Sequence, residues 1–367
     1  MMDAYGEGDV GSQPYNELPL LPPGVEIETK KTLKRAIAAN KALSELRFAG
    51  NLVPNQGILI RAMVLQEARL SSEIENIVTT NDELYRAFSA DEPTSDANTK
   101  EVLRYEEALW HGYNHIQENR PLSPSLFTNI ARIIKFGDLD VRKLPGTKIV
   151  NASTGRTAYM PPEGEDLIRA LIQNLCEYLN SEDHVDPLIK MAVAHYQFES
   201  IHPYPHGNGR IGRVINLLYL VERKLLDVPV LYLSRFITEN KAAYYHGLQA
   251  VTAEGAWEDW IVYMLDAIEQ TAGQTLSKLR SIQELVSSTI DEARSGMKTG
   301  YSRELIDLIF EQPYTRIDFL DRAGIAKRDS ATGYRLQASG KTGFWPEAWS
   351  LTADYFLGFR CASPPWK

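Results

Sequence analysis

The stretch IHPYPHGNGRIGR, residues 201–213, decides how the middle of this 367-residue chain is organised. It follows an amphipathic run that starts at Asp186–Pro187, a pair typical of a helix N-cap with proline in the first helical position. Pro203 predicts that this helix has ended, because the residue before a proline disfavours the α region. A second, apolar helix is predicted to begin at about Asn208–Arg210. The sequence therefore predicts two helices joined by a tight, glycine-rich turn.

That turn has the features of an anion-binding site. The first backbone N–H groups of a helix have no intrahelical partner, and the helix dipole is positive there. Gly207 and Gly209 allow the backbone to approach a ligand closely. Arg210 and Arg213 lie three residues apart on one face of the new helix, and two guanidinium groups beside free amides favour a polyphosphate. His202 precedes the same turn and is a candidate general base.

Residues 202–213 resemble the signature of the Fic family, H-P-F-x-[D/E]-G-N-G-R-x-x-R. Residues 71–76, SSEIEN, resemble the inhibitory motif [S/T]-x-x-x-E-[G/N] of Fic proteins that carry it N-terminally. A β-hairpin predicted over residues 144–162 is similar to the target-docking flap of the family. The resemblance covers roughly residues 30–335. It implies a mainly α protein, with a Fic-type helical core, a β-hairpin flap and a small C-terminal helix-turn-helix or winged-helix domain.

Fic enzymes generally transfer AMP from ATP to a hydroxyl side chain of a target protein, and the resemblance implies this activity here. His202 would take the proton from a Ser, Thr or Tyr hydroxyl, which attacks the α-phosphorus while pyrophosphate leaves. The residues implied in ATP binding are His206, Gly207, Asn208, Gly209, Arg210, Arg213, Tyr244 and Tyr245. The two tyrosines are explained equally well as core aromatics of a helix. The residues implied in target docking by strand addition are Gly155, Arg156, Thr157, Ala158 and Tyr159.

The inhibitory motif supplies Ser71, Glu75 and Asn76, on a helical run predicted from Gln56 to Val78. The resemblance implies that Glu75 pairs with Arg213 and occupies the γ-phosphate position, so that ATP binds in a nonproductive pose. Some family members with this glutamate also remove AMP from their targets, and the sequence leaves that activity open.

Two residues depart from the family signature. Tyr204 stands in place of phenylalanine, and its hydroxyl is expected to need a partner. His206 stands at the acidic position that normally holds Mg²⁺, which prefers hard oxygen ligands over imidazole. Several outcomes stay open: slow AMP transfer with Mg²⁺ at His206, transfer with a softer ion such as Mn²⁺, or transfer with His206 bonded directly to phosphate. A different phosphate-containing substrate is a further alternative, as is a degenerate Fic protein that binds nucleotide without transferring it.

The chain divides into four predicted regions: an extended arm over residues 1–24, an N-terminal helical region over 25–115 that contains the inhibitory helix, a catalytic domain over 116–298, and a winged-helix-like domain with an unassigned tail over 299–367. Residues 301–337 have helix-turn-helix patterning. They carry basic residues at Arg316, Arg322, Lys327, Arg328 and Arg335. A second hypothesis is therefore a regulator that contacts DNA, or another protein, through this unit.

Composition excludes several classes of protein. The 39 Lys and Arg residues against 48 Asp and Glu residues give a net charge of −9, which argues against broad nonspecific nucleic-acid binding. Apolar runs do not reach the ~18–20 residues of a membrane span, and the first ten residues lack a secretory signal pattern. Cys176 and Cys361 are too few for a disulfide framework or a cysteine-built zinc site. We expect a cytoplasmic protein, and a homodimer stays open.

Overall fold

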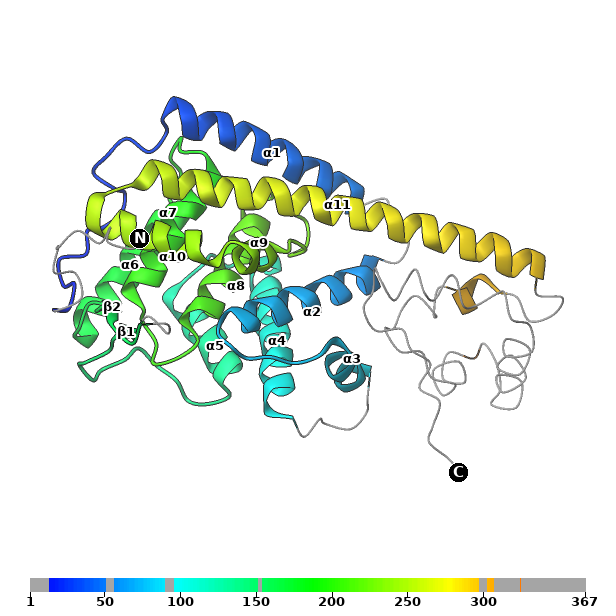
Figure 1. Ribbon diagram of the computed structural model, residues 1–367, viewed down its shortest axis with the longest axis horizontal. Helices are drawn as coiled ribbons and strands as arrows, with labels where there is room; N and C mark the ends of the chain where they lie inside the picture. The colour runs from blue at the N-terminus through cyan, green and yellow to red at the C-terminus, as the bar shows by residue number, and fades with distance from the viewer. Residues whose placement is uncertain are drawn as a thin grey trace.

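The computed structural model describes residues 13–50, 56–89, 96–150, 154–296 and 302–306, together with Gly324. These residues are mainly helical, with one two-stranded sheet, which confirms the predicted fold class (Figure 1). The helices are α1 (Lys30–Gly50), α2 (Gln56–Ile74), α3 (Asn81–Ser89), α4 (Ala97–Gln117), α5 (Pro124–Lys135), α6 (Glu165–Asn180), α7 (Pro187–Ile201), α8 (Asn208–Glu222), α9 (Leu233–Glu239), α10 (Lys241–Glu254) and α11 (Trp257–Gly296). The strands are β1 (Ile149–Val150) and β2 (Thr157–Tyr159).

A single hydrophobic cluster runs through most of the described chain, from Leu18 to Ile282. Helix α1 packs along α11 at the outside of the molecule, while α7 and α8 lie within the bundle (Figure 1). Nearly every side chain of α7 is buried, polar ones such as Lys190 and Gln197 included, so the predicted amphipathic pattern is wrong and this helix lies in the core. The predicted N-terminal helical region and the predicted catalytic domain therefore share one core.

The two helices around the signature begin and end where the sequence predicts. Asp186 caps α7, and its Oδ1 accepts hydrogen bonds from the backbone N–H groups of Leu188 at 2.8 Å and Ile189 at 3.4 Å. His202 ends α7 in the left-handed conformation, at φ 47°. Gly207 has φ 80° and immediately precedes α8, a position that favours glycine.

The inhibitory segment begins at Gln56 as predicted but ends earlier than predicted. Helix α2 stops at Ile74 and not at Val78, because Asn76 adopts a left-handed conformation with φ 63°. Gly and Asn, the two residues that the motif has at this position, are those that adopt this conformation most readily at the end of a helix. The next helix is capped by Thr80: its Oγ1 accepts from the N–H of Glu83 at 3.2 Å, and Glu83 Oε2 accepts from the N–H of Thr80 at 3.1 Å. Such a reciprocal capping box fixes the start of α3.

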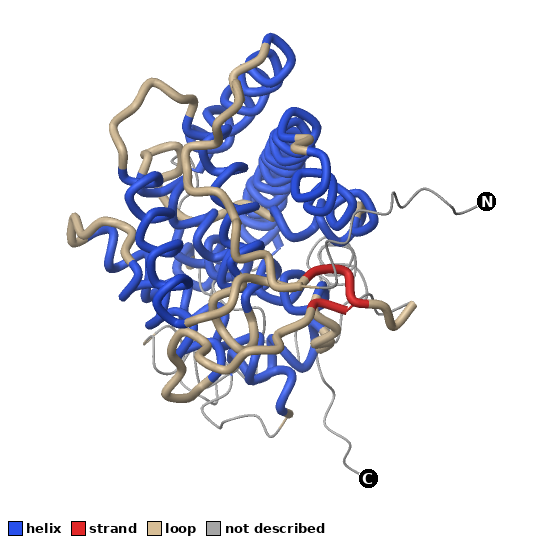
Figure 2. The backbone as a smooth tube through the Cα atoms, turned by 90° about the vertical axis from the view of Figure 1, so that its left-hand side faces the viewer, coloured by secondary structure: helices blue, strands red, loops and turns tan. Residues whose placement is uncertain are grey.

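The predicted hairpin is present, with β1 antiparallel to β2 and Ile149 opposite Tyr159 (Figure 2). Its tip, residues 151–153, lies outside the described residues. The N-terminal arm runs beside the base of the hairpin, where the N–H of Tyr15 donates to the carbonyl of Met160 at 2.9 Å. Three elements distant in sequence, the arm, the hairpin and the end of α7, therefore meet at one place.

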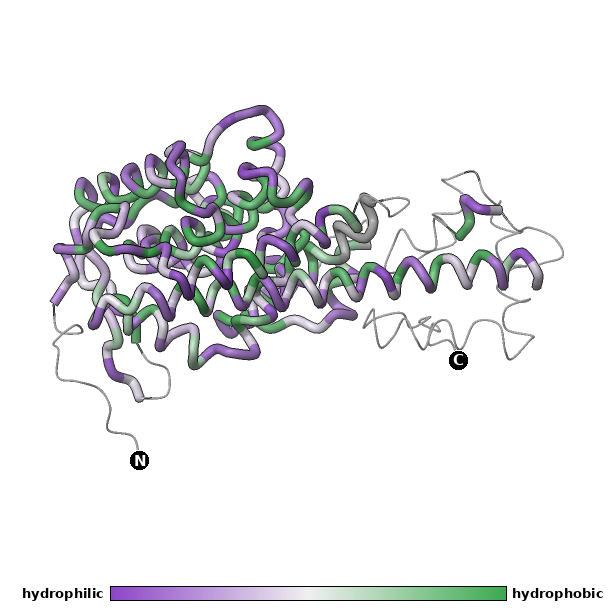
Figure 3. The backbone as a smooth tube through the Cα atoms, turned by 90° about the horizontal axis from the view of Figure 1, so that it is seen from above, coloured by the Kyte–Doolittle hydropathy of each residue, from purple (hydrophilic) through white to green (hydrophobic). Residues whose placement is uncertain are grey.

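The C-terminal half of α11 extends past the core, with alternating polar and apolar turns (Figures 1 and 3). Ile290 and Ala293 from this extension pack against Ile306 in a small second cluster. The rest of the predicted helix-turn-helix unit, with its basic residues and the aromatic tail, lies outside the described residues, apart from residues 302–306 and Gly324. Within the described ranges, no helix is both long and apolar enough to cross a membrane.

Candidate active site

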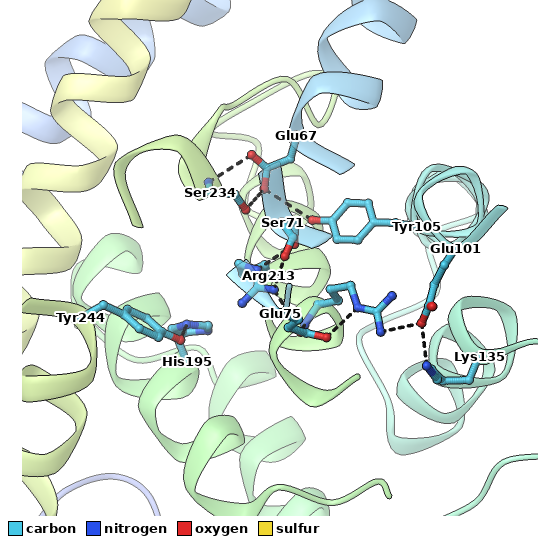
Figure 4. A network of polar contacts seen from close by, with 11 residues as sticks. Glu67, Ser71, Glu75, Glu101, Tyr105, Lys135, His195, Arg213, Ser234 and Tyr244 are labelled. Carbon is cyan, nitrogen blue, oxygen red and sulfur yellow. Dashed lines mark hydrogen bonds and ion pairs between the residues drawn. The ribbon is translucent and has the colours of Figure 1, made fainter. Parts of the chain in front are cut away.

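A carboxylate occupies the anion site predicted at the start of α8. Glu75 Oε1 accepts from the backbone N–H of Arg210 at 2.9 Å and from Arg213 Nη2 at 3.1 Å, while its Oε2 accepts from Arg210 Nε at 2.8 Å (Figure 4). A Cβ at position 209 would lie 2.9 Å from Glu75 Oε1, so a larger residue there would force the carboxylate to shift. The predicted Glu75–Arg213 pair is therefore present in the structure. Arg210 joins it through both its backbone and its side chain.

The two arginines are almost completely buried and are held by different partners. Arg213 Nε donates to Ser71 Oγ at 2.7 Å, and its Nη2 donates to the Ser71 carbonyl at 2.8 Å. Arg210 Nη2 lies 2.9 Å from Glu101 Oε1, which also accepts from Lys135 Nζ at 2.5 Å. Buried guanidinium groups are stabilised when their donors are paired in this way. The inhibitory helix therefore supplies the partners of Arg213 and shares those of Arg210 with α4.

His202 is half-buried at the end of α7, and it lies near enough to Glu75 for the charge of that carboxylate to act on the imidazole. Burial and, to a lesser extent, the positive charge of Arg142 lower the pKa of His202 to about 4, while the charge of Glu75 opposes the shift. Its Nδ1 is buried and has no hydrogen-bond partner among the described residues. At neutral pH the ring is therefore uncharged, which is the protonation state that a general base needs.

The side chain of Asn208 is bound within the turn itself. Its side-chain amide donates to the carbonyl of Tyr204 at 2.6 Å, and its Oδ1 accepts from the N–H of Tyr204 at 2.9 Å. These two bonds close the turn, so the side chain of Asn208 shapes the site and leaves its backbone N–H at the helix mouth. The hydroxyl of Tyr204 finds the partner that it needs, Thr128 Oγ1 at 3.1 Å.

The two tyrosines of α10 lie in different surroundings. Tyr244 is buried, and its hydroxyl lies 2.9 Å from Nε2 of His195 (Figure 4). The His195 ring is nearly parallel to that of Trp260, with their centroids 6.1 Å apart. Tyr244 therefore belongs to the core behind the site. Tyr245 packs against Tyr244 with 47% of its surface exposed, so of the two it is the side chain available to a ligand.

His206 is exposed beside the turn. In the part of the chain that the structure describes, no group of three His, Cys, Asp or Glu side chains could hold a metal ion. The carboxylates nearest to the helix mouth, Glu75 and Glu101, are engaged by arginines. The residues at this position therefore do not fit Mg²⁺, which takes oxygen ligands.

Sequence reasoning missed four residues that the structure brings to the site: Glu67, Glu101, Lys135 and Arg142. One sequence signal could have identified Glu67: Glu67, Ser71 and Glu75 are spaced by four residues, which places them along one side of the inhibitory segment. Its carboxylate accepts from the N–H of Ser234 at 3.1 Å and from the Ser234 hydroxyl, at the start of α9 (Figure 4). Helix α2 is therefore held by one stripe of polar side chains that contacts both α8 and α9.

Glu67→Gln is expected to make the stability of the protein less dependent on pH. Burial raises the pKa of Glu67 from 4.5 to about 7, although its bonds to Ser234 lower it. A carboxyl whose pKa is raised on folding contributes stability below pH 4.5 that is lost as the pH rises through about 7. At pH 8 the free energy of unfolding, measured by thermal unfolding, should then be larger for Glu67→Gln than for the wild type by on the order of 3 kcal/mol. Near pH 5 the two values should be similar. Glu45→Gln, at an exposed position of α1, is the control, and parallel pH curves for Glu67→Gln and wild type would contradict this account.

Comparisons with known proteins agree with this architecture. The Fic/DOC family N-terminal model matches residues 33–114, the Fic/DOC family model matches residues 121–220, and the model named "Protein adenylyltransferase SoFic-like, C-terminal domain" matches residues 285–344. The second of these spans the end of α7, the turn and most of α8. The chain therefore belongs to the Fic/DOC family.

Individual relatives match over shorter stretches. A probable protein adenylyltransferase of Aquifex aeolicus is 34% identical over 86 residues, which cover 23% of this chain and 27% of the relative. Protein adenylyltransferase Fic of Drosophila willistoni is 30% identical over 115 residues, 31% of this chain and 22% of the relative. The matches thus span about a quarter of the length of these relatives. A solved Fic family protein from Desulfovibrio desulfuricans covers 88% of this chain and 89% of its own, with a TM-score of 0.56 at 18% identity, a likeness of fold.

Proposed function

We propose that this chain is an autoinhibited protein adenylyltransferase that moves AMP from ATP to a hydroxyl side chain of a target protein. The observation that carries the proposal is the carboxylate of Glu75, bound by a helix N-terminus and by two buried arginines beside His202. A site that binds one anion through free amides and two guanidinium groups suits the phosphates of a nucleotide. The names of the curated relatives support the same activity.

In the proposed reaction, the neutral imidazole of His202 takes the proton of the target hydroxyl. The hydroxyl oxygen attacks the α-phosphorus, the bond from that phosphorus to the bridging oxygen breaks, and pyrophosphate leaves. The first amides of α8, with Arg210 and Arg213, hold the phosphates in line and stabilise the charge that develops. Most of the catalysis then comes from positioning and electrostatics, to which proton removal adds.

The proposed inhibition is a competition for the same donors. While Glu75 accepts from the N–H of Arg210 and from both guanidinium groups, those donors are withheld from the terminal phosphates of ATP. A nucleotide that enters must bind in a pose that leaves its phosphates displaced, as the family resemblance implies. Release would require α2 to move or Glu75 to turn away.

Intact-protein mass spectrometry of the wild type and of Glu75→Gly, after incubation with ATP and either Mg²⁺ or Mn²⁺, tests the proposal. We expect the added mass of one or more adenylyl groups on the Glu75→Gly protein, and fragmentation should locate them on hydroxyl side chains. Binding of ATP without any added mass would favour the degenerate nucleotide-binding alternative. If the protein neither binds ATP nor gains any added mass with either metal, the proposed function is wrong.

His206→Asp is expected to raise Mg²⁺-dependent transfer by on the order of tenfold, because it provides an oxygen ligand where an imidazole now stands. The measurement is the rate of self-modification against Mg²⁺ concentration, in the Glu75→Gly background. His206→Asn is the matched control, since it has a neutral oxygen in the same place and should give a smaller gain. Unchanged or lower activity of His206→Asp would count against a metal role for this position.

A further inference from the structure

The end of α7, which bears His202, is bound by two residues from the hairpin region. A helix leaves its last carbonyl groups without intrahelical partners. Here the Ser200 carbonyl accepts from the Tyr159 hydroxyl at 3.0 Å. Arg142 Nη2 donates to the Ile201 carbonyl at 3.1 Å, and its Nε donates to the carbonyl of His202 at 2.7 Å. The backbone N–H of Arg142 donates to the carbonyl of Pro203 at 2.9 Å, so four consecutive carbonyls have partners from two residues.

Both residues belong to the hairpin and its approach. Tyr159 is the last residue of β2, and Arg142 lies in the segment that leads into β1. Arg142 Nη2 also donates to the carbonyl of Pro162, just after β2, so one guanidinium group joins the base of the hairpin to the end of α7. Arg142 is buried, and among the described residues it forms no ion pair with a carboxylate. Its donors are therefore directed at carbonyl oxygens, which fixes backbone positions.

The conformation of His202 makes this support matter. A residue other than glycine with φ 47° and ψ 58° is in the left-handed region, which is unfavourable and persists only when its surroundings hold it. The carbonyls before, at and after His202 are those that Arg142 binds. The arm secures the opposite side of the hairpin, because the ring of Tyr15 lies edge-on to that of Tyr159 with their centroids 6.3 Å apart.

We propose that Arg142 and Tyr159 are positioning residues that lock the backbone of His202 to the hairpin, so that a target segment held along the hairpin is aligned with the imidazole. This inference rests on the proposed function and adds to it a mechanical link between target docking and the base. It assigns neither residue a contact with ATP, because the anion site is built by Glu75, Arg210 and Arg213.

Steady-state kinetics of self-modification, in the Glu75→Gly background, test the link. Tyr159→Phe removes one hydrogen bond and keeps the ring. Arg142→Lys keeps the positive charge but cannot bind three carbonyl groups at once. Arg142→Met removes the charge and the side-chain hydrogen bonds. We expect kcat to fall by about tenfold for Tyr159→Phe and by about a hundredfold for Arg142→Met, with Arg142→Lys between them. The KM for ATP should stay within about twofold, since misalignment of the base does not alter phosphate binding. Arg86→Met, at an exposed position of α3, and Tyr113→Phe, at a half-buried position of α4, lie far in sequence from the hairpin base and are the matched controls.

The pH profile separates positioning from a general loss of structure. The charged or titratable groups that act on His202 are Arg142 and His206, which lower its pKa, and Glu75, which raises it and is absent from the parent variant. Removal of the Arg142 charge should therefore move the acid limb of the profile to higher pH. Tyr159→Phe and Arg142→Lys should lower the rate without moving that limb. If the two residues had only a structural role, all three variants would lose rate and the acid limb of the pH profile would stay at the same pH in each.

The outcome can be read even if no transfer occurs. If the Glu75→Gly parent does not label itself, the proposed function fails, and the link is then tested by NMR of ¹³C-labelled histidines, with His202→Ala to assign the resonance. A shifted His202 resonance in Arg142→Met and in Tyr159→Phe supports the link. An unchanged His202 resonance in both, or a rise in KM for ATP that matches the fall in kcat, overturns it. Circular dichroism identifies any variant that fails to fold, and the conservative Tyr159→Phe then decides.

Discussion

Glu75→Gly is expected to label itself with AMP about 10- to 100-fold faster than the wild type. The carboxylate forms three hydrogen bonds to donors that the proposed function assigns to phosphate, two of them from buried guanidinium groups. A hydrogen bond to a charged group contributes about 1.5–3 kcal/mol, and one such bond is enough for a tenfold effect or more. Transfer of radiolabel from [α-³²P]ATP, measured as an initial rate, gives the ratio directly.

Two further variants control this result. Glu75→Gln keeps the size of the side chain and removes its charge, so an intermediate rate is expected. Glu73→Gly changes the last turn of α2, just before Glu75, where Glu73 pairs with Arg69 at 3.0 Å. It weakens the helix without emptying the anion site, so it should leave the rate near that of the wild type. Equal labelling by wild type and Glu75→Gly would remove Glu75 from a regulatory role.

The local part of the site could be predicted from the sequence, because it depends on neighbours. Asp186–Pro187 starts one helix, and Gly207 permits the turn into the next, so the anion site at Arg210 follows from short-range rules. The spacing of Ser71 and Glu75 likewise places both on one face of a helix. What such rules do not contain is the position of that helix against α8, which is set by packing.

The residues that sequence reasoning missed depend on contacts between distant segments. Arg142 meets the end of α7 about sixty residues away, and Lys135 reaches the site through Glu101. Neither has a local pattern that distinguishes it from a surface basic residue. Thr80 and Asp82 show a different limit, since both are good helix caps. The choice between them depends on the reciprocal bond with Glu83.

His202→Ala, made in the Glu75→Gly background, is expected to lower the rate of self-modification by about 10²- to 10⁴-fold, the usual contribution of a positioned general base. The affinity for ATP, measured by isothermal titration calorimetry, should change little, because phosphate is bound by the amides of α8 and by Arg210 and Arg213. A loss of rate without a loss of binding identifies a group that acts on the reacting hydroxyl.

His195→Ala provides the matched control for this prediction. His195 lies on α7 as well, two turns before His202, and burial lowers its pKa to about 3. Its ring contacts Tyr244 and Trp260 in the core, so His195→Ala should lower stability. The rate of the folded His195→Ala protein should fall much less than that of His202→Ala.

If His202→Ala retained the activity of its parent, the hydroxyl would have to transfer its proton to another group, and Glu199 would be the next group to test. Burial raises the pKa of that carboxyl to about 7, and its Oε1 has no hydrogen-bond partner within the described chain.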